Sequence, residues 1–209
     1  MDARRDYIAW MVDFGPVAGL TLASIIQAAA MGYLFVVVRD QINKLGEGTL
    51  GQIYAILIFA SFLVIIIIWL ETVMVTQSFR YPQNFWHVIL PFFMGLTQFL
   101  LIMSIDLHNV AWWYLSLSSV TLVALLMFFH TYRQARLYHE ENRVVLEKLG
   151  GSARTTEISI LVVTLIYLCF GVLESIWKLN SLYIAVFALA IIIAWMVNRN
   201  LYWKKITKR

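Results

Sequence analysis

Polar side chains set among apolar runs are the first residues in this sequence that could do chemistry. Gln27, Glu71, His87, Gln98 and His130 interrupt or border long apolar stretches. Ionisable and hydrogen-bonding groups are costly in hydrocarbon, and those retained there commonly serve binding, proton transfer or permeation. We therefore take these five as candidate intramembrane polar residues.

Glu71 lies between the runs IIIIWL and TVMVTQSF, and two interpretations of it are open. If the apolar helix ends near Leu70, Glu71 is an interfacial carboxylate. If the helix continues through TVMVTQSF, Glu71 lies a turn or two inside the membrane. It could then meet His87, His130 or Arg80, which we expect at the same end of their segments.

A second polar set shares one face of a helix. His87, Pro91, Gly95 and Gln98 follow one another at steps of four, four and three residues. Gln98 falls at mid-depth and needs a hydrogen-bond partner, and Gln27 is the expected one by depth. A polar clamp between helices is favoured over a permeation path, although both fit the pattern.

The sequence carries no constellation typical of catalysis, metal binding or cofactor binding. It has no Gly-rich phosphate loop, no Gly-x-Ser-x-Gly and no His-Glu-x-x-His. In the fragment HEEN, His139 and Glu140 fall on different helix faces, so a solvated charged face is favoured over a metal site. The histidines near apolar runs fall at their ends, which does not suit a bis-histidine haem. We expect a non-enzymatic protein without metal or cofactor.

The composition indicates whether the segments that carry these residues lie in water or in lipid. Of 209 residues, 61% are hydrophobic and 13% are charged, and the mean hydropathy is +0.77. Soluble domains carry about 25% charged residues. The composition therefore predicts an all-α integral membrane protein whose main partner is the lipid bilayer. No nucleic-acid binding is expected, because the net charge of +4 is better explained by the charge bias that orients membrane helices.

Six apolar runs are long enough to cross a bilayer, which takes about 20 residues each. They predict a single membrane domain with spans at about 14–38, 52–79, 85–105, 110–130, 158–177 and 182–201. If the N-terminus is cytoplasmic, thirteen of the 16 Lys and Arg residues fall inside and three fall outside. By the positive-inside rule both termini are then cytoplasmic. We expect the plasma membrane, which is the inner membrane if the source is bacterial.

The segment that follows the fourth span is predicted to project into the cytoplasm. Residues 131–156 form its helix and loop, and nothing between Phe129 and Leu149 breaks a helix. We therefore expect the fourth helix to continue unbroken to Leu149. An apolar line runs along the projection and should bury against the chain itself, a second protomer or a cytosolic partner. Its candidate partner-binding or oligomer-binding residues are Arg136, Leu137, Tyr138, Arg143, Val144 and Val145.

Small residues in the first span allow close helix approach, either within one chain or between protomers, and a homo-oligomer is expected. The favoured function is a non-enzymatic membrane sensor or anchoring subunit that couples the membrane to a cytosolic partner, in a stress-type or defence-type role. The alternative is a small homo-oligomeric channel or transporter. An intramembrane enzyme has the least support, because no paired catalytic groups are found.

Overall fold

The fold is a bundle of long helices. The computed structural model describes residues 3–42, 48–82, 84–106, 109–149, 152–178 and 182–207. Within these ranges it has seven helices, namely α1 (Ala3–Gln41), α2 (Gly48–Ser78), α3 (Phe85–Asp106), α4 (Val110–Leu137), α5 (His139–Leu149), α6 (Ser152–Trp177) and α7 (Leu182–Thr207). Six of them are long and apolar enough to span a membrane, whereas α5 has 11 residues. The expectation of an all-α chain with six apolar spans is confirmed.

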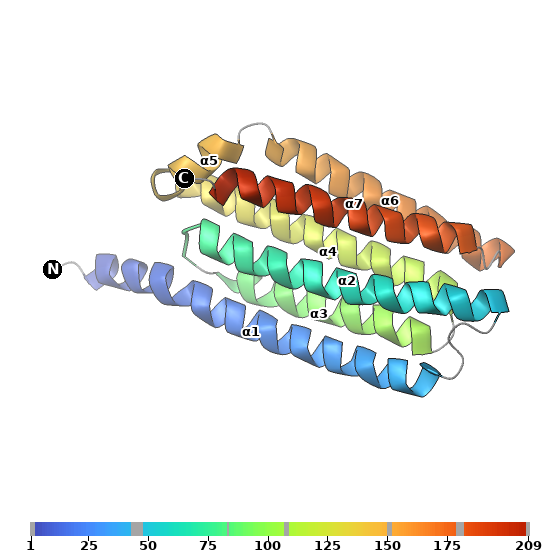
Figure 1. Cartoon of the computed structure of the whole chain (residues 1–209). Coiled ribbons are helices and arrows are strands. Elements are labelled where there is room, and N and C mark those ends of the chain that lie inside the picture. Colours follow the sequence, from blue (N-terminus) through green and yellow to red (C-terminus); the bar gives the residue numbers. More distant parts are fainter. Residues whose placement is uncertain are drawn as a thin grey trace.

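The long helices lie side by side, and α5 caps one end of the bundle (Figure 1). At this end α2 and α4 finish, α3 and α6 begin, and α7 finishes; we call it the α5 end and the opposite one the far end. The most extensive neighbouring pairs are α4 with α6 and α3 with α4. α1 packs on α2 and α3, while α7 packs mainly on α2.

Hydroxyl and indole groups make the hydrogen bonds that join the helices. The indole Nε1 of Trp113 on α4 donates to Ser61 Oγ on α2 at 2.9 Å. On the other side of α4, Thr164 Oγ1 of α6 donates to Thr121 Oγ1 at 2.9 Å. Tyr167 of α6 donates to the carbonyl of Ala188 on α7 at 3.2 Å. Each of these polar side chains thus finds a partner on a neighbouring helix.

The expected clamp between Gln27 and Gln98 is wrong as a hydrogen bond. Both side chains are buried, and Gln98 is 0% exposed. Within the described residues, both amide atoms of Gln98 and the Oε1 of Gln27 have no hydrogen-bond partner. α1 and α3 instead contact each other by close packing at Gly95, where a Cβ would collide with the side chain of Ile26.

The expected continuous helix through Leu149 is also wrong, because the helix is interrupted at Tyr138. This residue caps α4 with φ −108° and ψ 54°, outside the helical region. Arg136 lies in the last turn of α4, and Glu140 and Glu141 lie in the first turn of α5, so each charge complements the partial charge of its own helix terminus. The chain can therefore turn here and fold α5 back onto the bundle.

The interruption divides the apolar line on this segment into two faces. Leu149 is buried in a small core with Phe79, Tyr81, Ala135 and Trp203, which we call the α5 cluster. Tyr138 and Val145 pack against this cluster. Leu137 and Val144 point away and are 68% and 61% exposed. Part of the line is thus buried by the chain itself, and part is free for another surface.

Candidate functional site

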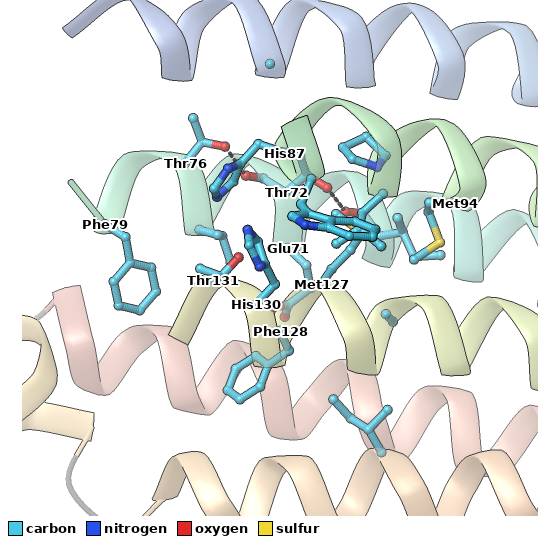
Figure 2. Close-up of a pocket in the computed structure, with 18 of the residues that line it drawn as sticks. Glu71, Thr72, Thr76, Phe79, His87, Met94, Met127, Phe128, His130 and Thr131 are labelled. Carbon is cyan, nitrogen blue, oxygen red and sulfur yellow. Dashed lines mark hydrogen bonds between the residues drawn. The ribbon is translucent and has the colours of Figure 1, made fainter. Parts of the chain in front are cut away.

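A cavity of about 120 Å³ lies toward the α5 end, between α2, α3, α4 and α7. Its walls are mainly apolar, and its polar lining includes Glu71, Thr72, Thr76, His87, His130, Thr131 and Arg199. Figure 2 shows Thr72 and Thr76 of α2 on one side and His130 and Thr131 of α4 on the other, with His87 of α3 close to both. Three of the five candidate polar residues therefore line one cavity.

Glu71 forms a buried ion pair on one side of this cavity. α2 continues to Ser78, so Glu71 lies inside the helix rather than at its end. Its carboxylate accepts hydrogen bonds from Arg199 Nε and Nη2, each at 2.7 Å, and from Trp203 Nε1 at 3.0 Å. The side chains are 22% exposed for Glu71 and 6% for Arg199. The expected partners His87, His130 and Arg80 are not the ones that bind it.

Aromatic rings enclose the guanidinium of Arg199. Its Cζ lies 4.2 Å from the ring centroid of Tyr202, 5.4 Å from that of Trp203 and 5.8 Å from that of Phe128. Bidentate pairing and cation–π contact are the two strong ways to hold a guanidinium out of water. The pair is mutually neutral, so this wall of the cavity carries no net charge.

His87 is fixed by the N-terminus of α3. Asn84 caps that helix, because its side-chain oxygen accepts from the N–H of Trp86 at 3.1 Å. In return the N–H of Asn84 donates to Nδ1 of His87 at 3.0 Å. This is the reciprocal arrangement of a capping box, with histidine in the place usually taken by Glu or Gln. Because Nδ1 accepts, the neutral imidazole carries its proton on Nε2.

His130 joins the same network from α4. Its Nε2 lies 3.3 Å from Oδ1 of Asn84, an amide oxygen that can only accept, so Nε2 is the donor. The ring centroids of His87 and His130 are 4.7 Å apart. Nε2 of His87 is buried and, among the described residues, has no hydrogen-bond partner. The cavity thus contains one preset donor that is ready for an acceptor.

Tyr81, in the connection from α2 to α3, also contacts the ring of His87. Its ring centroid is 4.8 Å from that of His87, and its hydroxyl donates to Thr131 Oγ1 at 3.5 Å. Burial raises the pKa of Tyr81 above its ordinary value, and the bond to Thr131 only partly opposes this. The phenol therefore stays protonated and neutral, like the rest of the lining.

Two contacts connect the cavity walls to α5. The side chain of Asn142 on α5 accepts from the N–H of Arg80 and donates to its carbonyl, each at 2.7 Å. Arg80 lies in the connection that carries Tyr81 and Asn84. On the other wall, Trp203 binds Glu71 and belongs to the α5 cluster with Leu149. α5 is therefore attached to both the histidine wall and the ion-pair wall.

Sequence reasoning missed Arg199, Asn84 and Asn142. Arg199 was counted only as a basic residue at a span end, although its spacing to Tyr202 and Trp203 places all three on one helix face. The string NFWH, Asn84 to His87, has the spacing of a capping box and could have indicated the contact between Asn84 and His87. In HEEN the first three residues are exposed as expected, but Asn142 is 1% exposed. Nothing in the local sequence indicates its distant partner.

A second hollow of about 310 Å³ adjoins the cavity between α4, α6 and α7. It shares Ile160, Trp195 and Arg199 with the first one. Within the described residues, no three side chains from His, Cys, Asp and Glu lie close enough together to hold a metal ion. The arrangement is suited to binding a largely apolar molecule beside a few fixed polar atoms.

Comparison with protein-family models, with curated proteins and with solved structures finds no match to this chain. The functional argument therefore rests on the geometry of the site.

Proposed function

We propose that this protein is a multi-pass membrane sensor in which occupancy of the cavity acts on α5, and α5 in turn binds a cytosolic partner. The protein itself performs no catalysis in this proposal. It works as a homo-oligomer in the plasma membrane and serves as the membrane anchor of its partner.

The observation that carries the proposal is the double attachment of α5. Asn142 ties α5 to the connection that positions Asn84 and both histidines, and Trp203 ties the α5 cluster to Glu71. A molecule that spreads or draws together these walls must change the contacts of α5. Ligands shift such equilibria by binding one arrangement more tightly than the other.

The charge distribution supports a cytosolic α5. The basic side chains gather at the α5 end, where Arg80, Arg133, Arg136, Arg143 and Arg154 lie. Under the positive-inside rule this end faces the cytoplasm, with both termini on the same side. α5 is then available to soluble proteins.

The outward face of α5 and its neighbouring turn is the proposed partner surface. Leu137 and Val144 are exposed there, flanked by Arg136 and Arg143. Arg136 is held over the ring of Tyr132 at 4.5 Å, and Arg143 pairs with Glu147 at 3.9 Å. An apolar centre with a charged rim is the usual composition of a protein interface.

The test is to fill the cavity and observe α5. Ala124 lines the cavity, whereas Ala28 is exposed on α1 and is the matched control. We expect Ala124→Phe to speed hydrogen–deuterium exchange of residues 139–149 in nanodiscs, because the added ring displaces the walls that hold α5. Ala28→Phe should leave this exchange unchanged. Equal exchange of residues 139–149 in both variants and the wild type would remove the basis of the sensor.

The second candidate function is a homo-oligomeric channel or transporter. The Oε1 of Gln27 and both amide atoms of Gln98, which are buried and have no hydrogen-bond partner among the described residues, favour it, because unsatisfied polar atoms suit a path for water or a polar solute. Flux into proteoliposomes that Gln98→Leu abolishes would favour this function over the sensor. Absence of flux for ions and small polar solutes would count against it.

A further inference from the structure

The polar atoms of the cavity specify the charge of its occupant. Glu71 and Arg199 neutralise each other at 2.7 Å, and His87 is a neutral ring because its Nδ1 accepts the hydrogen bond from Asn84. A charged molecule would enter an apolar space with no free counter-charge, which is strongly unfavourable. The fitting occupant is therefore uncharged.

One atom specifies the polar group of that occupant. Nε2 of His87 carries a proton, is buried and has no partner among the described residues. A buried donor without an acceptor is unfavourable, so a molecule that brings an acceptor oxygen gains this hydrogen bond on entry. A carbonyl oxygen is such an acceptor and carries no proton that would need a second partner.

The size and surroundings of the cavity favour a ring as the part of the occupant that carries this acceptor oxygen. The volume of about 120 Å³ is close to that of apolar cavities that hold benzene, about 150 Å³. Planar groups stand beside the donor, with the rings of Tyr81 and His130 at 4.8 and 4.7 Å from that of His87. A flat ring can stack among them.

The route of entry favours a molecule from the bilayer. Trp86 lines the cavity and is 52% exposed on an apolar helix. The adjoining hollow between α4, α6 and α7 extends the cavity past Trp195, and Ala194 of α7, which lines this hollow, is exposed. A lipid tail can lie in this hollow while the head reaches His87.

We infer that the cavity binds the ring of a lipid-soluble quinone, with one ring carbonyl accepting the Nε2 proton of His87. The inference rests on the proposed function, since it names the ligand class of the same cavity. It concerns binding alone, and no electron or proton is transferred.

The experiment uses the full chain in nanodiscs of synthetic phosphatidylcholine. The probe is a short-chain 1,4-benzoquinone, and saturable binding is measured above the partition into protein-free discs. We expect His87→Phe to weaken binding at least about tenfold, because a ring remains but the donor is lost. His139→Phe, on the exposed surface of α5, is the matched control and should bind like the wild type.

Two further measurements keep the inference falsifiable if His87→Phe folds poorly. Ala124→Phe should abolish saturable binding with His87 intact, while Ala28→Phe should not. The infrared carbonyl band of an isotope-labelled quinone should shift to lower frequency when bound to the wild type, as a hydrogen bond requires.

Three results would overturn the inference: no saturable binding to the wild type, equal affinity in His87→Phe, or an unshifted carbonyl band. Displacement of the probe by octanoylglycerol at lower concentration than by a second benzoquinone would assign the cavity to a neutral acylglycerol instead. A quinone that binds as expected without altering exchange in residues 139–149 would contradict the sensor but not the ligand class.

Discussion

Two buried amides in this protein have opposite surroundings. Asn142, where α5 meets the bundle, is 1% exposed, and both ends of its amide bind backbone groups at 2.7–2.8 Å. Gln98, in α3, is 0% exposed and has no hydrogen-bond partner within the described residues. Burial alone therefore does not say what a polar residue contributes. A satisfied amide stabilises one arrangement, whereas an unsatisfied one opposes folding unless it serves another purpose.

The ion pair of Glu71 and Arg199, a satisfied polar contact like that of Asn142, gives the largest expected effect. Glu71→Ala leaves Arg199 charged, 6% exposed and without its bidentate partner. We expect the free energy of unfolding to fall by about 3–5 kcal/mol, the range for removing one partner of a buried pair. Unfolding in a denaturing detergent series measures it. Glu140→Ala, at an exposed carboxylate in the first turn of α5, should change stability by no more than about 1 kcal/mol. A loss below about 1 kcal/mol for Glu71→Ala would mean that Arg199 reaches water or another acceptor.

Removal of the satisfied amide should have an intermediate and local effect. Asn142→Ala leaves the N–H and carbonyl of Arg80 without their partner, at a cost of about 1–3 kcal/mol. We expect faster hydrogen–deuterium exchange in residues 139–149, with the six spans unaffected. An exposed residue of the same helix provides the control, His139→Ala, for which exchange should stay as in the wild type. Slow exchange of α5 in Asn142→Ala would show that the α5 cluster suffices to hold it.

Removal of the unsatisfied amide should have the smallest effect. Gln98→Leu replaces an amide that makes no hydrogen bond with an apolar side chain of similar size. We expect stability to stay within about 1 kcal/mol of the wild type, or to rise, because no bond is lost and no polar group is left buried. A loss above about 2 kcal/mol would reveal a hydrogen bond to Gln98 and would make the two amides alike.

The sequence was a good guide to what local composition determines. Six apolar runs of sufficient length predict six spans, because the bilayer requires that length of each helix. Glu71, His87 and His130 stood out as polar residues beside apolar runs, and they line one cavity. The side-chain partners of these residues were harder to predict, since Glu71 pairs with Arg199, which lies 128 positions away in the sequence.

The interruption at Tyr138 could not be predicted from helix propensity alone. Helix formers dominate residues 132–149, so local preference indicates continuity. The turn depends on Asn142, whose amide donates to the carbonyls of Tyr138 and Arg80. Tertiary hydrogen bonding thus overrides local preference, and only the reversal of charge from Arg136 to Glu140 indicates it in the sequence.

The most direct test of coupling between the cavity and α5 is a double-mutant cycle. Exchange of residues 139–149 is measured in the wild type, in Ala124→Phe, in Asn142→Ala and in the double variant. If the filled cavity acts on α5 through the contact of Asn142 with Arg80, we expect Ala124→Phe to speed exchange less in the Asn142→Ala background than in the wild type, since coupled residues are not additive. Equal and additive effects of Ala124→Phe in the two backgrounds would exclude the route through Asn142, and an Ala124→Phe variant that leaves this exchange unchanged in both backgrounds would contradict the proposed sensor.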